Sequence, residues 1–203
     1  MPVADVTAFV RAALPDPPAR VLEVGAGDGE LAAALAAAGY EVVAIDPHSE
    51  ADGVRRVALH ELDEAPFDAA LAVLSLHHVE PLEQSLARLG ALVRPGGVLA
   101  IDEFDVERFD ERGARWWLDR RADPGDPAAV VAAHADLHPL RRLRAALEPW
   151  FELGEPVRGA YLYRWDMPAE VRDEEETLIA AGDLAATGAR LVGIRRPSAS
   201  GGA

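Results

Sequence analysis

The chain has 203 residues, half of them hydrophobic and 27% charged, which is enough to bury the core of one domain and argues against disorder of the whole chain. Acidic residues outnumber basic ones by 35 to 20, and the resulting net charge of −15 argues against a nucleic-acid partner or an anionic membrane surface. Every cation is an arginine and cysteine is absent, which excludes Schiff-base chemistry, a Walker lysine, disulfides and thiolate-bound metals.

Short apolar runs alternate with helical patterns in the first hundred residues. An amphipathic helix is predicted over residues 3–14, and a proline-rich segment ends it. Five strands are predicted from apolar β-favouring runs, at residues 20–24, 41–45, 54–59, 67–74 and 98–101. Helices are predicted between them, at residues 31–38 and 82–93. Because the strand runs are nearly continuous rather than alternating, we expect helices on both faces of a mostly parallel, doubly wound α/β sheet.

The pattern is less regular beyond residue 101. Helices are predicted at residues 128–135, 139–147 and 173–181, β-favouring residues occur within 151–165, and a final strand is predicted at 189–195. We expect one domain over residues 1–196, with halves at 1–104 and 105–196, and a disordered tail over 197–203. Since no apolar run has the length of a signal peptide or a membrane-spanning helix, we also expect a cytoplasmic protein.

A glycine-rich turn joins the first predicted strand to the helix that follows it. Its glycines, Gly25, Gly27 and Gly29, allow a tight turn with positive φ and let a ligand lie against the main chain. Asp46 follows the second strand, 21 residues after Gly25, which is the spacing of an acid that binds ribose hydroxyls. Because neighbouring strand ends share one crevice, the turn and Asp46 are predicted to contact the same nucleoside.

The spacing of this turn is Gly-x-Gly-x-Gly, whereas a dinucleotide-binding turn would have a third glycine where this chain has Glu30. Together with the segments at 67–68, 76–79 and 89–99, the turn resembles class I S-adenosylmethionine-dependent methyltransferases of the small-molecule branch. The resemblance covers residues 20–104. It implies a Rossmann-like seven-stranded sheet with an antiparallel last strand, helices on both faces and helical cap insertions. Residues 189–195 suit the last strand, and residues 105–196 would form the acceptor half.

The resemblance also implies which residues bind the methionyl and ribose parts of S-adenosylmethionine. Gly25, Ala26 and Gly27 would pack against them, and Glu23 would orient the methionyl ammonium. Asp46 would bind the ribose hydroxyls. Main-chain carbonyls at Ala72 and Val73 would meet the methionyl group.

For the adenine, the resemblance implies Pro47 beside the ring and contacts from Glu61 and Leu62, although the loop that carries the last two residues is shorter than is usual in the family. Val73 stands where metal-dependent catechol-type members carry an acid, so we expect no metal. No Asn-Pro-Pro-Tyr or Asp-Pro-Pro-Tyr tetrad follows the fourth strand, which argues against methylation of DNA bases or glutamine. The implied partner is a small-molecule acceptor for a monomer or homodimer, with no nucleic acid and no membrane.

Candidate catalytic residues are His77 and His78, which follow the fourth strand; either could act as a general base, or His77 could be a packing residue. The pair Asp102 and Glu103 after the fifth strand could line the acceptor site or cap the next helix. His134 and His138 have helical metal-ligand spacing, yet Pro139 follows at once, which favours a surface or acceptor-pocket role.

Several features of the second half allow two interpretations. The aromatic residues there could form a lid over a flat acceptor or the core of a cap: Trp116, Trp117, Tyr161, Tyr163 and Trp165. The acidic run at 173–176 is interpreted as the first turn of a helix. Two other functions also stay open for the chain. One is an NAD(P)-dependent oxidoreductase, which the missing third glycine disfavours, and the other is a non-catalytic S-adenosylmethionine-binding protein.

Overall fold

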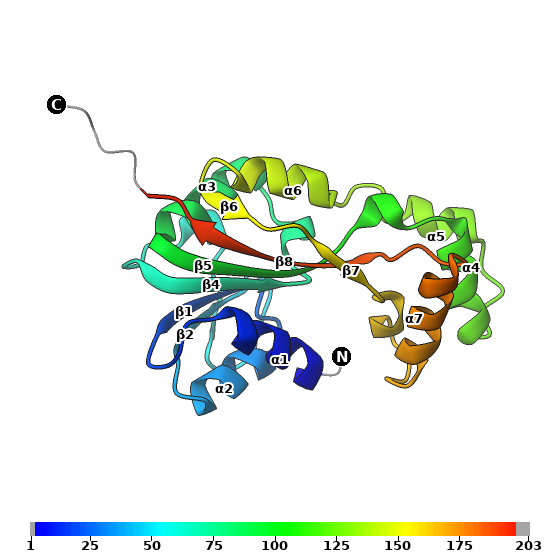
Figure 1. The fold of residues 1–203 in the computed structure, drawn as a ribbon, viewed down its shortest axis with the longest axis horizontal. Coiled ribbons are helices and arrows are strands. Elements are labelled where there is room, and N and C mark those ends of the chain that lie inside the picture. The colour runs from blue at the N-terminus through cyan, green and yellow to red at the C-terminus, as the bar shows by residue number, and fades with distance from the viewer. Residues whose placement is uncertain (1–2, 198–203) are drawn as a thin grey trace.

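One sheet runs through the middle of the molecule in a computed structural model that describes residues 3–197 (Figure 1). The strands pair in the order β3-β2-β1-β4-β5-β8-β6, with β7 also paired to β8. Their bounds are β1 (Arg20–Val24), β2 (Glu41–Ile45), β3 (Val54–Arg55), β4 (Phe67–Val73), β5 (Val93–Phe104), β6 (Phe151–Leu153), β7 (Val157–Gly159) and β8 (Gly188–Arg195). Strands β1 to β5 pair in parallel, and β8 lies antiparallel to β5. The predicted doubly wound α/β sheet with an antiparallel last strand is confirmed.

The sheet has eight strands rather than the seven that the family resemblance implies. The extra strand arises where the β-favouring stretch after residue 150 is interrupted at Gly154, Glu155 and Pro156. Proline lacks an N–H group for a strand ladder, so the stretch divides into β6 and β7. Both short strands pair with β8, so β8 lies between β5 on one side and β6 and β7 on the other.

Helices cover both faces of the sheet, as the apolar strand runs predict (Figure 1). The helices are α1 (Val3–Ala13), α2 (Glu30–Ala37), α3 (Leu82–Leu92), α4 (Glu111–Arg120), α5 (Pro127–Ala132), α6 (Leu140–Leu147) and α7 (Val171–Ala181). On one face, α1 and α2 pack on a core that includes Val21 and Leu71. On the other face, α3 and α6 pack on a core that includes Leu22 and Ile101. Adjacent strand residues thus point to opposite faces, and both faces are apolar.

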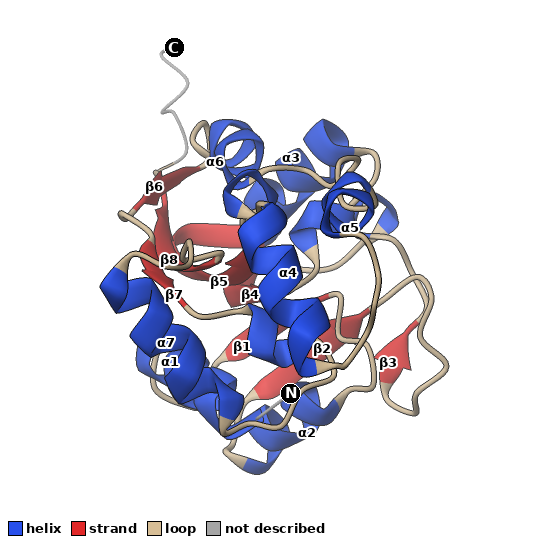
Figure 2. Cartoon of the chain, turned by 90° about the vertical axis from the view of Figure 1, so that its right-hand side faces the viewer, coloured by secondary structure: helices blue, strands red, loops and turns tan. Residues whose placement is uncertain are grey.

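A third core holds the cap together at the end of β5, where α4, α5 and α7 gather (Figure 1). Figure 2 looks onto this end of the molecule, with α4 in front of the sheet. The cap core includes Trp116 and Tyr161, both buried, and Tyr161 stacks on Phe104 of β5 at 4.7 Å between ring centroids. Trp116 and Tyr161 therefore belong to the core of the cap, as one of the two interpretations of the aromatic residues expects.

Some predicted boundaries differ from the structure. The third strand is predicted over 54–59, but it ends at Arg55, because the chain then turns into a 3₁₀ helix at Leu59–Glu61. The tail predicted to be disordered lies outside the described residues, except for residue 197. Within residues 3–197, no helix has both the length and the apolar character needed to cross a membrane.

Candidate active site

The glycine turn lies between the end of β1 and the start of α2, and its shape depends on glycine. Gly25, Gly27 and Gly29 have φ values of 71°, 54° and 77°, which disfavour side chains. A Cβ at Gly25 would lie 2.2 Å from the Cβ of Ser75, whereas a Cβ at Gly27 would meet nothing within 4 Å. Gly25 is thus required by close packing, and Gly27 leaves open space beside the main chain.

Asp46 ties this turn to the end of β2. Its Oδ2 accepts a hydrogen bond from the N–H of Gly27 at 3.1 Å, and its Oδ1 accepts from the N–H groups of His48 and Ser49 at 2.8 and 3.1 Å. The structure therefore brings together the turn and the acid that their spacing predicts to be neighbours. Each carboxylate oxygen has two lone pairs, so these bonds leave acceptor capacity for a ligand hydroxyl.

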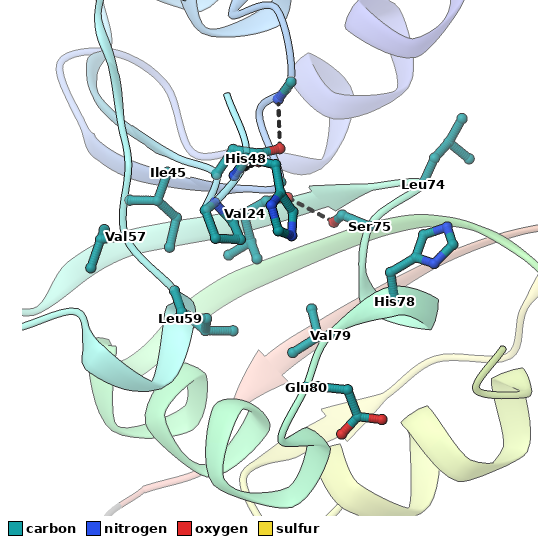
Figure 3. Close-up of a pocket in the computed structure, with 15 residues that line it drawn as sticks. Val24, Ile45, His48, Val57, Leu59, Leu74, Ser75, His78, Val79 and Glu80 are labelled. Carbon is teal, nitrogen blue, oxygen red and sulfur yellow. Dashed lines mark hydrogen bonds between the residues drawn. The ribbon is translucent and has the colours of Figure 1, made fainter. Parts of the chain in front are cut away.

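A cavity of about 570 Å³ opens at the carboxyl ends of β1, β2 and β4 (Figure 3). Apolar side chains form much of its wall, among them Ile45, Val57 and Leu59. Its polar lining includes Asp46, His48, Ser75, His78 and Glu80. An apolar cavity of this size with a few polar groups is typical of a small-molecule site.

A smaller cavity of about 150 Å³ adjoins the first, since Gly25 and Leu74 line both. Glu23 lines it and is only 3% exposed, and its Oε2 has no hydrogen-bond partner within the described part of the chain. Burial, and then the nearby charge of Asp28, raises the pKa of Glu23 to about 8. A buried carboxyl group without a partner fits a ligand that brings a positive charge, such as an ammonium group.

The turn after β4 borders both cavities, since Leu74 lines the two of them and Ser75 lines the larger one. Leu74 has a φ of 56°, and its N–H donates to the carbonyl of Asp102 at 2.8 Å. The hydroxyl of Ser75 donates to the carbonyl of Val24 at 2.7 Å, which draws the turn against the end of β1. Ser75 points toward Val24 in Figure 3. This turn therefore fixes the distance between β4 and the glycine turn.

The two candidate catalytic histidines of this turn have different surroundings. His77 is buried, and its Nδ1 pairs with Oε2 of Glu103. His78 is exposed and lines the larger cavity. Partial desolvation and then the neighbouring His77 lower the pKa of His78, so its imidazole is neutral at pH 7.

Most of the other predicted cofactor residues lie at the two cavities. Gly25, Gly27, Asp46 and Pro47 line the larger one, and Glu23, Gly25, Ala26 and Val73 line the smaller one. Ala72 instead lies in the core of the sheet.

The structure brings neither Glu61 nor Leu62 to these cavities. Glu61 is exposed, and Leu62 is buried in the core beneath α3. The shorter loop brings Val57, Ala58 and Leu59 to the wall where the resemblance implies the later pair. Sequence reasoning missed these three residues because β3 ends four residues earlier than its apolar pattern suggests.

His134 and His138 have separate partners. His134 stacks on Trp165 at 4.8 Å between ring centroids, and its Nδ1 lies 2.8 Å from the carbonyl of Val130. His138 is buried, with Nε2 3.0 Å from Oε1 of Glu80. Within residues 3–197, no three histidine, aspartate or glutamate side chains gather in a way that could hold a metal ion.

Sequence comparisons point to one class of protein. The profile of a family described as a methyltransferase domain matches residues 3–148. An uncharacterised methyltransferase of Mycobacterium bovis is 40% identical over 114 residues, which cover 48% of this chain and 56% of the relative. The chain thus spans about half the length of this curated relative.

Solved structures share the fold over nearly the whole chain. The N-methyltransferase NodS from Bradyrhizobium japonicum, in complex with S-adenosylhomocysteine, is 14% identical with a TM-score of 0.60, over 97% of this chain and 89% of NodS. The 1,6-didemethyltoxoflavin-N1-methyltransferase of Burkholderia thailandensis, with 1,6-didemethyltoxoflavin and S-adenosylhomocysteine bound, is 22% identical with a TM-score of 0.56, over 97% of this chain and 77% of that one. At these identities the likeness concerns the fold.

Proposed function

The chain belongs to the methyltransferase domain family, and on that basis we propose that it is an enzyme that uses S-adenosylmethionine to methylate a small-molecule acceptor at oxygen, nitrogen or carbon. One observation carries the proposal. Two cavities adjoin at Gly25 and Leu74, and both have acidic linings, which include Asp46 in the larger cavity and the buried Glu23 in the smaller one.

The larger cavity suits the adenosyl part of this cofactor. Asp46 can accept hydrogen bonds from ribose hydroxyls, and its contact with Gly27 places it beside the open main chain of the turn. The apolar walls formed by Ile45, Val57 and Leu59 suit the faces of an adenine ring. We therefore assign Val57, Ala58 and Leu59 to the adenine contact instead of Glu61 and Leu62.

The smaller cavity suits the methionyl part. Glu23 lies there without a hydrogen-bond partner in the described chain, and a nearby ammonium group would stabilise its ionised form. Gly25 and Ala26 line this cavity with little side-chain bulk, and Val73 lines it as well. The shared residues Gly25 and Leu74 then mark where the two parts of the cofactor meet, at the sulfonium centre.

The chemistry that the bound cofactor supplies is a sulfonium methyl group, open to in-line displacement by a nucleophilic atom of the acceptor. The chain has to hold that atom in line and, for a hydroxyl or amine, accept its proton. His78 is the candidate base, because it lines the cavity and its lowered pKa keeps the imidazole neutral. His77 is the second candidate, and its Nδ1 is already engaged by Glu103.

A small-molecule acceptor is supported by the acidic surface, since a net charge of −15 repels nucleic acids and anionic membranes. The solved relative from Burkholderia thailandensis holds such an acceptor in the same fold, which supports the proposal by analogy. A monomeric or homodimeric state and a cytoplasmic location stay predictions from the sequence.

The test uses S-adenosylmethionine with an isotopically labelled methyl group and a library of phenols, amines and heterocycles. We expect label in at least one acceptor and formation of S-adenosylhomocysteine, both detected by mass spectrometry. The variant Gly27→Ala is the control, because its methyl group would enter the cavity. Binding of S-adenosylhomocysteine without any transfer would instead support a non-catalytic binding protein, and binding of NADH would support an oxidoreductase.

A further inference from the structure

We propose that Glu103 is a positioning residue of this site, which anchors the turn after β4 and thereby sets where Ser75 and His78 line the larger cavity. The inference rests on the proposed function, because it concerns how the same site is assembled. Glu103 itself lines neither cavity described above.

Glu103 is fully buried near the end of β5, and its carboxylate gathers three partners from a single turn. Oε1 accepts from the N–H groups of Ser75 and Leu76 at 3.1 and 2.6 Å. Oε2 pairs with Nδ1 of His77. These partners lie 26 to 28 residues earlier in the chain, so the bonds fix the turn to the neighbouring strand.

The anchored turn reaches the larger cavity at two points. Ser75 donates to the carbonyl of Val24, and its Cβ occupies the space that a side chain at Gly25 would need. The ring of His77 lies 4.3 Å from that of His78, centroid to centroid, and so supports the imidazole that lines the cavity. Releasing the carboxylate would therefore free both contacts at once.

Glu175 provides a comparison within the same chain. It is also fully buried, and its carboxylate accepts from the N–H groups of Tyr161, Leu162 and Tyr163 at 2.8, 2.9 and 2.8 Å. It anchors a turn of the cap, and no histidine is among these partners. The two glutamates thus have similar burial and similar backbone partners, but only the turn held by Glu103 borders the cofactor cavity.

The bond to His77 also specifies a tautomer. A carboxylate cannot donate, so Nδ1 of His77 must carry the proton in the wild-type protein. In Glu103→Gln, the amide oxygen is expected to face the two N–H groups of Ser75 and Leu76, because an NH₂ group there would leave both unpaired. The amide NH₂ would then donate to Nδ1, and His77 would switch to the Nε2–H tautomer.

The first measurement is ¹⁵N NMR of the histidine side chains in the full-length protein. We expect a protonated Nδ1 at His77 in the wild type and in Glu175→Gln, and an unprotonated Nδ1 in Glu103→Gln. An unprotonated Nδ1 in the wild type, or no change in Glu103→Gln, would overturn the assignment. This readout needs no substrate, so it is independent of whether the proposed function holds.

The second measurement is the affinity for S-adenosylhomocysteine by titration calorimetry. Glu103→Leu and Glu175→Leu each remove a buried carboxylate from a turn, so both are expected to lose stability. The affinity for S-adenosylhomocysteine is expected to fall about tenfold or more in Glu103→Leu, which corresponds to roughly one lost hydrogen bond. In Glu175→Leu it is expected to change less than about twofold. Equal losses in the two variants would show that Glu103 has only a general structural role.

If Glu103→Leu does not fold, substitutions of its partner decide the question. His77→Asn keeps a side-chain donor near the position of Nδ1, whereas His77→Leu removes it. We expect His77→Asn to bind S-adenosylhomocysteine more tightly than His77→Leu does, by about fivefold or more, a factor within the range of one hydrogen bond. Equal affinities of the two variants would contradict the proposal.

Discussion

Replacing Glu23 with glutamine removes a buried group whose charged form the fold disfavours. Burial, followed by the charge of Asp28, raises the pKa of Glu23 from 4.5 to about 8. Between these two pH values the folded protein keeps a proton that the unfolded chain has released. Glu23 therefore makes the free energy of unfolding fall as the pH rises through this window.

The magnitude follows from the width of the window. Each pKa unit is worth about 1.4 kcal/mol, so a shift from 4.5 to about 8 corresponds to a change on the order of 5 kcal/mol. Glutamine keeps the shape of the side chain but has no charged form. We thus expect the difference in unfolding free energy between Glu23→Gln and the wild type to increase by several kcal/mol between about pH 5 and about pH 9, in favour of the variant.

Urea unfolding at the two pH values measures this difference, and groups that titrate in both proteins cancel. Glu61→Gln is the matched control, because Glu61 is exposed and lies away from both cavities. Its stability should follow that of the wild type at each pH. If the free energies of unfolding of the wild type and Glu23→Gln changed in parallel with pH, the reasoning would be refuted.

The same group gives a second readout if the cofactor's ammonium binds beside it. Near pH 7, Glu23 is mostly protonated in the ligand-free protein, so binding of a cation should release a proton. Calorimetry of S-adenosylhomocysteine in two buffers of different ionisation enthalpy should show this release in the wild type and little of it in Glu23→Gln. A wild type that binds the ligand without proton release would place the ammonium elsewhere.

Three further predictions concern the larger cavity. Asp46→Ala should weaken S-adenosylhomocysteine binding by about 1–3 kcal/mol in calorimetry. The control Glu50→Ala removes an exposed side chain and should leave the affinity unchanged. Equal affinities of Asp46→Ala and the wild type would contradict the role of Asp46. Gly27→Ala should lower the free energy of unfolding by only about 1–2 kcal/mol, because its Cβ would meet no protein atom within 4 Å, yet it should abolish S-adenosylhomocysteine binding because the methyl group would enter the cavity. Gly25→Ala should destabilise the fold more, because its Cβ would overlap Ser75. Thermal unfolding that ranks the two variants in the reverse order would refute this prediction. His78→Gln should lower turnover of a hydroxyl or amine acceptor by roughly 100-fold and leave cofactor affinity nearly unchanged. Wild-type activity should persist below pH 6.5, because the pKa of His78 is lowered. An unchanged turnover in His78→Gln would exclude His78 as the base.

Much of the fold was predictable because its signals are local. Strands β1, β2 and β4 are short apolar runs, and the turn at Gly25 and Gly27 with Asp46 has a spacing that reports a shared crevice. The structure accordingly places Asp46 in hydrogen-bond contact with Gly27. Hydrophobic periodicity and motif spacing thus suffice to predict strands and the residues that meet at neighbouring strand ends.

The features that sequence reasoning missed depend on contacts between distant residues. Glu103 and His77 are 26 residues apart, and nothing in the sequence of either segment indicates that the Glu103 carboxylate binds the turn that carries His77. Glu175 belongs to an acidic run interpreted as the start of a helix, yet its side chain points into the cap to bind the turn at Leu162. Leu59, rather than Glu61 or Leu62, lines the cavity that we assign to the adenine. The length of the loop after β3, not its composition, decides which residues reach this cavity.

A crystal structure of the protein soaked with S-adenosylhomocysteine tests the central claim most directly. The account predicts the adenosyl group in the larger cavity with its ribose hydroxyls on Asp46, and the methionyl group in the smaller cavity with its ammonium beside Glu23. A ligand bound elsewhere, or both cavities closed by the protein's own side chains at saturating ligand, would contradict it.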